Sequence, residues 1–404
     1  MATQLGDGVE YESMEAANEI PRPKRRPRRL LAAVMGGALL VYAATTMGGA
    51  IGIPPLELAK TVSMPHTGEW CSGSGAATYT KKTLKTVAER PVSGLLTYTK
   101  SSAENKYEAS DVIRVGNQFY VVCDSSWSIL RFEHSLPLLS SDNEAIQPTF
   151  EPPDDGDSGF EAIMHDATSE GDFYVIRESL QHEVTGNYHA YILKVHIGES
   201  GETYDVVETC RSEIAFEGDS KGFEGATSLR GADGTLYLLG LCEGNFCSET
   251  RGKEVGNGRV IVMAREDDAD DGCIWKTVKT LELPKAVQFV DYSAFAVHHS
   301  TMAVAVTSQE NSQLWVGSLV GGADGKFEPA TASFGEGKIF DFPRTSHACD
   351  VQYCNIEGVH WVSGQDSDKA PQMLVAVSDK MKSKGRQAST CFDKDQSVHL
   401  FTLP

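Results

Sequence analysis

Apolar residues occur along most of this chain in short runs and not at helical spacing. After residue 90, runs rich in Val, Ile, Tyr, Phe and Leu alternate with turns that contain Gly and Asp. Such runs, bounded by turn residues, are typical of β-strands. No helical period is sustained in this part of the sequence. The pattern therefore predicts an all-β fold.

The strand pattern also repeats. A short strand that opens with a small polar or acidic residue is followed by a turn, an apolar strand such as LYLLGL, and a third strand. Five copies occupy residues 108–132, 159–179, 222–244, 291–319 and 355–379. Repeats of this kind are typical of β-propellers, whose blades surround a central channel. We expect one five-bladed β-propeller over residues 91–404, with six blades or a β-sandwich as alternatives.

One apolar run is left over before the first copy. SGLLTYTK at 93–100 precedes the repeats, and the last copy ends with SVHLFTL at 397–403. A propeller usually closes its ring by pairing strands from the two ends of the chain. The run at 93–100 is thus expected to complete the last blade.

The N-terminal region has a different pattern. Residues 30–53 (LLAAVMGGALLVYAATTMGGAIGI) carry no charge and follow the basic run RPKRRPRR. A helix of this length would cross a hydrocarbon core, and preceding basic residues stay in the cytosol. We expect a cytosolic tail at 1–29, a transmembrane signal-anchor at 30–53, a stalk at 54–90 and a lumenal (ER or Golgi) or extracellular propeller. The alternative is a protein secreted after signal cleavage.

The cysteines and the net charge limit the compartment in which the protein resides and the partners that it can bind. All nine cysteines follow the apolar segment, and an exported domain permits disulfides. Cys242 with Cys247, and Cys349 with Cys354, have spacings that would close small loops, although sequence leaves the connectivity open. The net charge of −20 argues against a nucleic-acid partner and favours cations.

The first strand of each propeller blade lines the channel. The polar residues that open the five copies are Ser110 (followed by Asp111), Glu161, Glu224, Ser293 and Glu357. Carboxylates that converge on one axis repel each other, so they must be protonated or share a cation. Oxygen ligands without Cys or His suit a hard ion, and calcium takes six to eight of them. For any single residue the alternative is a strand-end cap or a solvated side chain.

These openings resemble those of the calcium-activated nucleotidase (apyrase) family, in the segments ASDV (109–112), FEAI (160–163), FEGA (223–226), YSAF (292–295) and IEGV (356–359). A weaker similarity is to phytase-type esterase-like propellers. The apyrase resemblance implies a five-bladed propeller with calcium held by Ser110, Asp111, Glu161, Glu224, Ser293 and Glu357. The chain departs from that family at Cys123-Asp124-Ser125, where one acid and an arginine near the nucleotide are missing. This departure weakens the expectation of nucleotide hydrolysis.

Two functions follow from this pattern. The first is a calcium-dependent phosphohydrolase of nucleotides or other phosphate esters, with Asp124 or Glu161 as the catalytic base. Its substrate phosphate would need basic neighbours, and the candidates are Arg177, Lys221 and the loop at 378–386. The second is a non-catalytic propeller that calcium stabilises and that binds a protein or a glycan.

Overall fold

The structure is a computed structural model, and it describes residues 82–96, 107–153, 156–169, 171–219, 221–243, 247, 255–256, 258–321, 326–346, 349–362, 371–380 and 389–404. The chain divides into units 1–63 and 64–404, and all described residues belong to the second. The predicted tail at 1–29, the predicted anchor at 30–53 and most of the predicted stalk lie outside the described residues. None of the described helices is long and apolar enough to cross a membrane.

The described strands form hydrogen-bonded sheets of 4, 12 and 5 strands, and these divide into five antiparallel groups, here called blades 1 to 5, one for each predicted copy. Short parallel pairings join blades 1 to 3 into the 12-stranded sheet. Blade 1 contains β2 (Ala109–Val115), β3 (Gln118–Cys123), β4 (Ser126–Glu133) and β5 (Glu144–Pro148). Blade 2 contains β6 (Phe160–His165), β7 (Asp172–Gln181), β8 (Tyr188–Ile197) and β9 (Thr203–Phe216). Blade 3 contains β10 (Phe223–Arg230), β11 (Leu236–Cys242), β12 (Arg259–Asp268) and β13 (Gly272–Glu282).

The last two blades use less regular outer strands. Blade 4 contains β14 (Ala294–Val297), β15 (Ala303–Ser308) and β16 (Gln313–Val320), which pairs with both β17 (Ser333–Phe334) and β18 (Lys338–Asp341). Blade 5 contains β19 (Ile356–Trp361), β20 (Met373–Ser378), β21 (Ser397–Thr402) and β1 (Lys85–Pro91). A short helix α1 (Val92–Leu95) follows β1, and a 3₁₀ turn at Ser389–Lys394 precedes β21.

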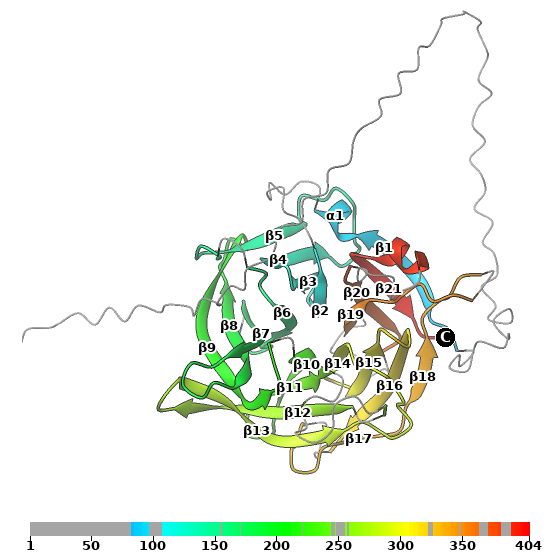
Figure 1. The fold of residues 1–404 in the computed structure, drawn as a ribbon. Coiled ribbons are helices and arrows are strands. Elements are labelled where there is room, and N and C mark those ends of the chain that lie inside the picture. Colours follow the sequence, from blue (N-terminus) through cyan, green and yellow to red (C-terminus); the bar gives the residue numbers. More distant parts are fainter. Residues whose placement is uncertain are drawn as a thin grey trace, which may run out of the picture. The chain divides into compact units, whose positions relative to one another are not determined.

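The first strands of the blades make a closed ring. Strand β2 packs on β6, β6 on β10, β10 on β14, β14 on β19, and β19 back on β2, so these five are called the inner strands (Figure 1). Five clusters of buried apolar side chains fill the spaces between adjoining blades. Burial of apolar surface between sheets is thus the main force that holds the ring. The predicted all-β class and propeller-like arrangement are confirmed.

The ring closes at a different segment from the one we expected. Strand β1 pairs antiparallel with β21, and it lies within the predicted stalk at 54–90. The segment predicted to close the ring, 93–100, instead contributes to α1, whose Val92 and Leu95 are buried; residues 97–100 are outside the described part. Glu89 on β1 holds the closure through Lys394 Nζ at 2.6 Å and His399 Nδ1 at 3.2 Å.

Disulfides reinforce individual blades and one junction between blades. Three of them join described residues: Cys210–Cys273, Cys242–Cys247 and Cys354–Cys391. The expected Cys242–Cys247 pair is confirmed, whereas Cys349–Cys354 is wrong because Cys354 bonds the distant Cys391, which lies in the turn before β21. Disulfides in this number are typical of a domain outside the cytosol.

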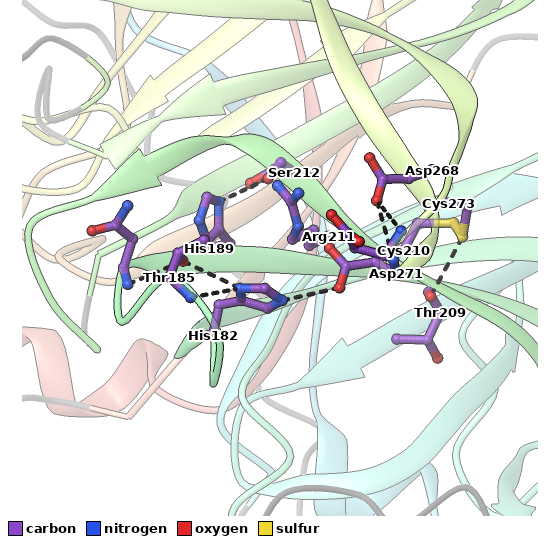
Figure 2. A network of polar contacts seen from close by, with 12 residues as sticks. His182, Thr185, His189, Thr209, Cys210, Arg211, Ser212, Asp268, Asp271 and Cys273 are labelled. Atoms are coloured by element: carbon purple, nitrogen blue, oxygen red, sulfur yellow. Dashed lines mark hydrogen bonds and ion pairs between the residues drawn. A yellow bond between two sulfur atoms is a disulfide. The ribbon is translucent and has the colours of Figure 1, made fainter. Parts of the chain in front are cut away.

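The junction of blades 2 and 3 has its own polar network (Figure 2). Asp271, in the turn between β12 and β13, accepts hydrogen bonds from His182 Nε2 at 3.0 Å and from the guanidinium of Arg211. Next to it, β13 pairs in parallel with β9, and Cys273 is bonded to Cys210. The grouping of Glu208 with these two cysteines is not a metal site, because the sulfurs are bonded to each other.

Candidate metal centre at the start of the inner strands

The predicted channel residues share one backbone device. In four inner strands, pairing with the second strand of the blade skips one residue, and the skipped residues are Ser110, Glu161, Glu224 and Glu357. Such a β-bulge leaves the extra residue outside the ladder and re-aims its side chain. The fifth residue, Ser293, directly precedes β14, and its backbone N–H donates to Thr307 O at 3.0 Å. Four of the five copies therefore share a β-bulge at this position, in addition to a polar or acidic residue.

The ring is narrow at these positions. A Cβ on Gly225, the residue after Glu224, would lie 2.6 Å from Phe295 N of the next inner strand. A Cβ on Gly358, after Glu357, would lie 2.7 Å from Asp111 Cα. Glycine is therefore required where one backbone approaches the next. Because these contacts join equivalent positions of neighbouring strands, the bulged residues lie on the same end of the ring.

Three glutamates on this end interact through their charges, because Glu224 and Glu357 both act on Glu161. Glu161, Glu224 and Glu357 are half-buried, whereas the residues on either side of each are buried. Burial raises the pKa of Glu161 well above its usual range, and the negative charges of Glu224, Asp124, Glu178 and Glu357 raise it further. All the charged groups that shift this pKa are carboxylates. A set of oxygen donors with this mutual repulsion fits a hard divalent cation.

The other three predicted ligands are bonded to the frame. Asp111 is buried, and its two carboxylate oxygens accept the backbone N–H groups of Val112 at 2.8 Å and of Ile163, in the next blade, at 3.0 Å. The Ser293 hydroxyl donates to Ile356 O of the next blade at 2.7 Å. Ser110 Oγ accepts from Asp124 N at 3.1 Å. Each of these side chains already stabilises the ring, and their role as metal ligands remains a prediction.

Glu178, an acidic residue that sequence reasoning missed, adjoins the predicted residues Asp124 and Glu161. One carboxylate oxygen from each of Asp124, Glu161 and Glu178 lies within 4.8 Å of the others. Burial, followed by the charges of Asp157 and Glu108, raises the pKa of Asp124 to about 6. Burial, followed by the charges of Asp124, Glu243 and Asp219, raises the pKa of Glu178 to about 7. Both carboxyl groups therefore titrate near neutral pH.

A sequence signal for Glu178 exists in hindsight. Acidic residues stand near the end of the second strand in four blades: Asp124, Glu243 and Asp379 directly follow their strands, and Glu178 lies three residues before the end of β7. In blade 2 the pairing of β7 with β8 shifts between Arg177 and Leu180, so Glu178 lies in an irregular part of its strand. The strand-opening residues and these strand-closing acids share one end of the propeller.

Basic side chains on this end differ in their partners. Lys221 Nζ contacts Glu243 at 2.8 Å, and Lys380 Nζ contacts Glu108 at 2.9 Å. Arg177 Nε donates to the backbone O of Ser158 at 2.6 Å, and its guanidinium carbon lies 4.8 Å from the ring centroid of Trp127. Of the candidate loop 378–386, only residues 378–380 are described.

Comparisons with known proteins give a distant structural similarity only. No family model matches the chain, and none of the curated proteins matches it. Solved structures that resemble it include a PQQ-bound aldose sugar dehydrogenase from Streptomyces coelicolor, with 13% identity, a TM-score of 0.40, and coverage of 80% of this chain and 98% of the other. A glutaminyl cyclase from Myxococcus xanthus has 9% identity and a TM-score of 0.41, with coverage of 80% and 98%. These β-propeller enzymes are varied, and at such scores they support no argument about chemistry.

Proposed function

We propose that this chain is a membrane-anchored, extracytosolic five-bladed β-propeller that binds calcium at the start of its inner strands and hydrolyses phosphate esters, with nucleotides as one substrate class. The proposed anchor is 30–53, and the proposed relationship is to the calcium-activated nucleotidases. The observation that carries the proposal is the bulge at three glutamates of the inner strands, together with the four carboxylates, Glu224 and Glu357 among them, whose charges raise the pKa of Glu161. The net charge of −20 argues against nucleic acid as a partner.

The proposed ligands are Glu161, Glu224 and Glu357, with Ser110, Asp111 and Ser293 completing the oxygen set. Calcium bound there would supply Lewis-acid polarisation of a phosphoryl oxygen. The cost of burying three carboxylates near each other supports this assignment, because it is offset only by protonation or by a cation.

The chain's own side chains supply the proton chemistry. Asp124 and Glu178 have pKa values of about 6 and about 7, so each can take a proton from an attacking water at neutral pH. Glu161, the other candidate base, interacts with four carboxylates and is better suited to hold the cation. Asp124 is therefore the proposed base, and Glu178 is its neighbour within 4.8 Å.

The metal site is tested by thermal unfolding of the full chain in calcium and in EGTA. A ligand present at about 100 times its Kd stabilises a protein by about 2.7 kcal/mol. We expect a calcium-dependent rise in Tm of several degrees. The variant Glu224→Gln should lose this rise, and the exposed Glu328→Gln, far from the inner strands in sequence, should keep it. Equal curves in calcium and EGTA for the native chain would remove the metal site.

A second function is favoured by a separate observation. Asp111 and Ser293 each bond across two blades, so this end of the ring has a clear structural role. A calcium-stabilised propeller that binds a protein or glycan partner would use the same residues without chemistry. Phosphate release from ADP, UDP, GDP and simple phosphate esters, measured in calcium, separates the two. Calcium binding without phosphate release across the panel would leave only the binding function.

A further inference from the structure

Arg177 is held in place by contacts from two blades. It lies on β7 of blade 2, and its guanidinium faces the ring of Trp127 on β4 of blade 1 at 4.8 Å. Its Nε donates to Ser158 O at 2.6 Å. A cation over an indole ring is attracted by the ring's negative face, and the contact also restricts the side chain. The guanidinium thus has one fixed orientation.

The residue that fixes Arg177 also fixes the proposed base. The Ser158 hydroxyl donates to the backbone oxygens of Cys123 at 2.7 Å and Asp124 at 2.9 Å, and Gly159 N donates to the same Asp124 oxygen at 2.9 Å. The indole N–H of Trp127 donates to Gly156 O at 3.1 Å, in the same loop. One short segment, 156–159, therefore sets the positions of Asp124 and Arg177 relative to each other.

Arg177 differs from the lysines on this end of the propeller. Lys221 and Lys380 each contact a carboxylate, at 2.8 Å and 2.9 Å. Among the described residues, no carboxylate forms an ion pair with the Arg177 guanidinium, although the charge of the neighbouring Glu178 acts on it. Its terminal Nη groups form a planar fork of the kind that binds phosphate through two parallel hydrogen bonds.

We infer that Arg177 anchors the anionic group of the substrate, and that Trp127 is the positioning residue that holds Arg177 for it. This inference rests on the proposed function. It narrows the ligand to a molecule with a terminal phosphate, whose oxygens can accept two hydrogen bonds from Arg177. The surrounding end of the propeller is rich in carboxylates, so an anion is accepted only together with the cation. The expected ligand is a phosphate monoester or diphosphate in complex with calcium.

The test is calorimetric titration of inorganic phosphate into the full chain, in calcium and in EGTA. In calcium, Arg177→Met should weaken phosphate binding about tenfold or more, the loss of a charge-assisted bidentate contact. Arg177→Lys keeps the positive charge but loses the planar fork, so its affinity for phosphate should lie between those of the native chain and Arg177→Met. Trp127→Leu should weaken binding several-fold, whereas Trp127→Phe, which keeps an aromatic face, should restore most of it. Arg265→Met, on β12, the third strand of blade 3, is the matched control and should bind as the native chain does.

Each outcome bears on the inference separately from the proposed function. Native-like phosphate binding by Arg177→Met, or an equal loss in Arg265→Met, would overturn the anchor. No phosphate binding by the native chain in calcium would also overturn it. Phosphate binding that depends on Arg177, with no release from any ester, would keep the anchor and remove the hydrolase. If Arg177→Met fails to fold, the phosphate affinities of Arg177→Lys, Trp127→Leu and Trp127→Phe test the anchor instead.

Discussion

The two ends of the inner strands carry side chains of opposite charge type, acidic at the start and basic at the finish. Every inner strand starts at an oxygen donor and ends near a basic residue, and these second residues are Arg114, His165, Arg230, His298-His299 and His360. At the starting end, the groups that surround Glu161 are all acidic. At the finishing end, Arg230 is paired with an acid, and the pKa values of His165, His299 and His360 are lowered.

At the finishing end, two histidines have lowered pKa values and one arginine is paired. Burial, with a further contribution from His298 and His165, lowers the pKa of His299, and burial lowers the pKa of His360 to about 3, so these histidines are neutral near pH 7. Arg230 is paired to Asp166 through Nη2 at 2.6 Å. A histidine can lose its proton at little cost at this pH, whereas a carboxylate must gain one or find a cation. The comparison therefore supports the start of the strands as the proposed cation site.

The largest test of this comparison is the close approach at the acidic end. In Gly225→Ala, the new Cβ would lie 2.6 Å from Phe295 N, so β10 and β14 must separate. Overpacking of this kind costs about 1–3 kcal/mol, and the separation should also reduce the calcium-dependent rise in Tm. Chemical denaturation in calcium and in EGTA measures both effects. Gly222→Ala is the matched control, because its nearest contact would be Ser179 N at 4.0 Å; an equal loss in both variants would contradict the narrow ring.

A smaller effect is expected from pH in the metal-free protein. Asp124 and Glu178 have folded-state pKa values of about 6 and about 7, above the ordinary 3.8 and 4.5. Because the folded state binds the proton more tightly, stability should increase as pH falls through 7 and 6, by about 1 kcal/mol after allowance for partial exposure. Urea unfolding in EGTA from pH 8 to pH 5 measures this slope. Asp124→Asn with Glu178→Gln should flatten it, and a native chain that loses stability over this window would refute the assignment.

The positions of the bulged residues could be predicted from sequence because the same polar position recurs in five copies of the repeat. Glu224 alone is a polar residue in an apolar strand, but five copies align the positions that the ring later brings together. The local bulge was not readable, since it depends on how each strand pairs with its neighbour. Glu178 was missed because it lies inside β7, where only the pairing with β8 shows that the strand is irregular after Arg177.

Ring closure and one disulfide were mispredicted for a related reason. Strand β1 (KTVAERP) carries charged residues and no clear alternation, and it is recruited by backbone pairing with β21 and by the contacts of Glu89 with Lys394 and His399. Partners of this kind lie about 300 residues away in the chain, so local pattern favours the more apolar 93–100. Cys354 likewise bonds Cys391 across the fold and not its sequence neighbour Cys349.

The smallest expected effect concerns the finishing end. His299 has a folded-state pKa below its ordinary 6.5, so the unfolded chain binds the proton first and stability should fall as pH decreases below 6.5. In His299→Asn this contribution is absent, so the variant should match the native chain within about 0.5 kcal/mol at pH 7 and lose less stability by pH 5. Urea unfolding in saturating calcium isolates this slope from the carboxylates. A reduced calcium response in His299→Asn at pH 7 would show that the two ends are coupled, and the separation drawn between them would then be wrong.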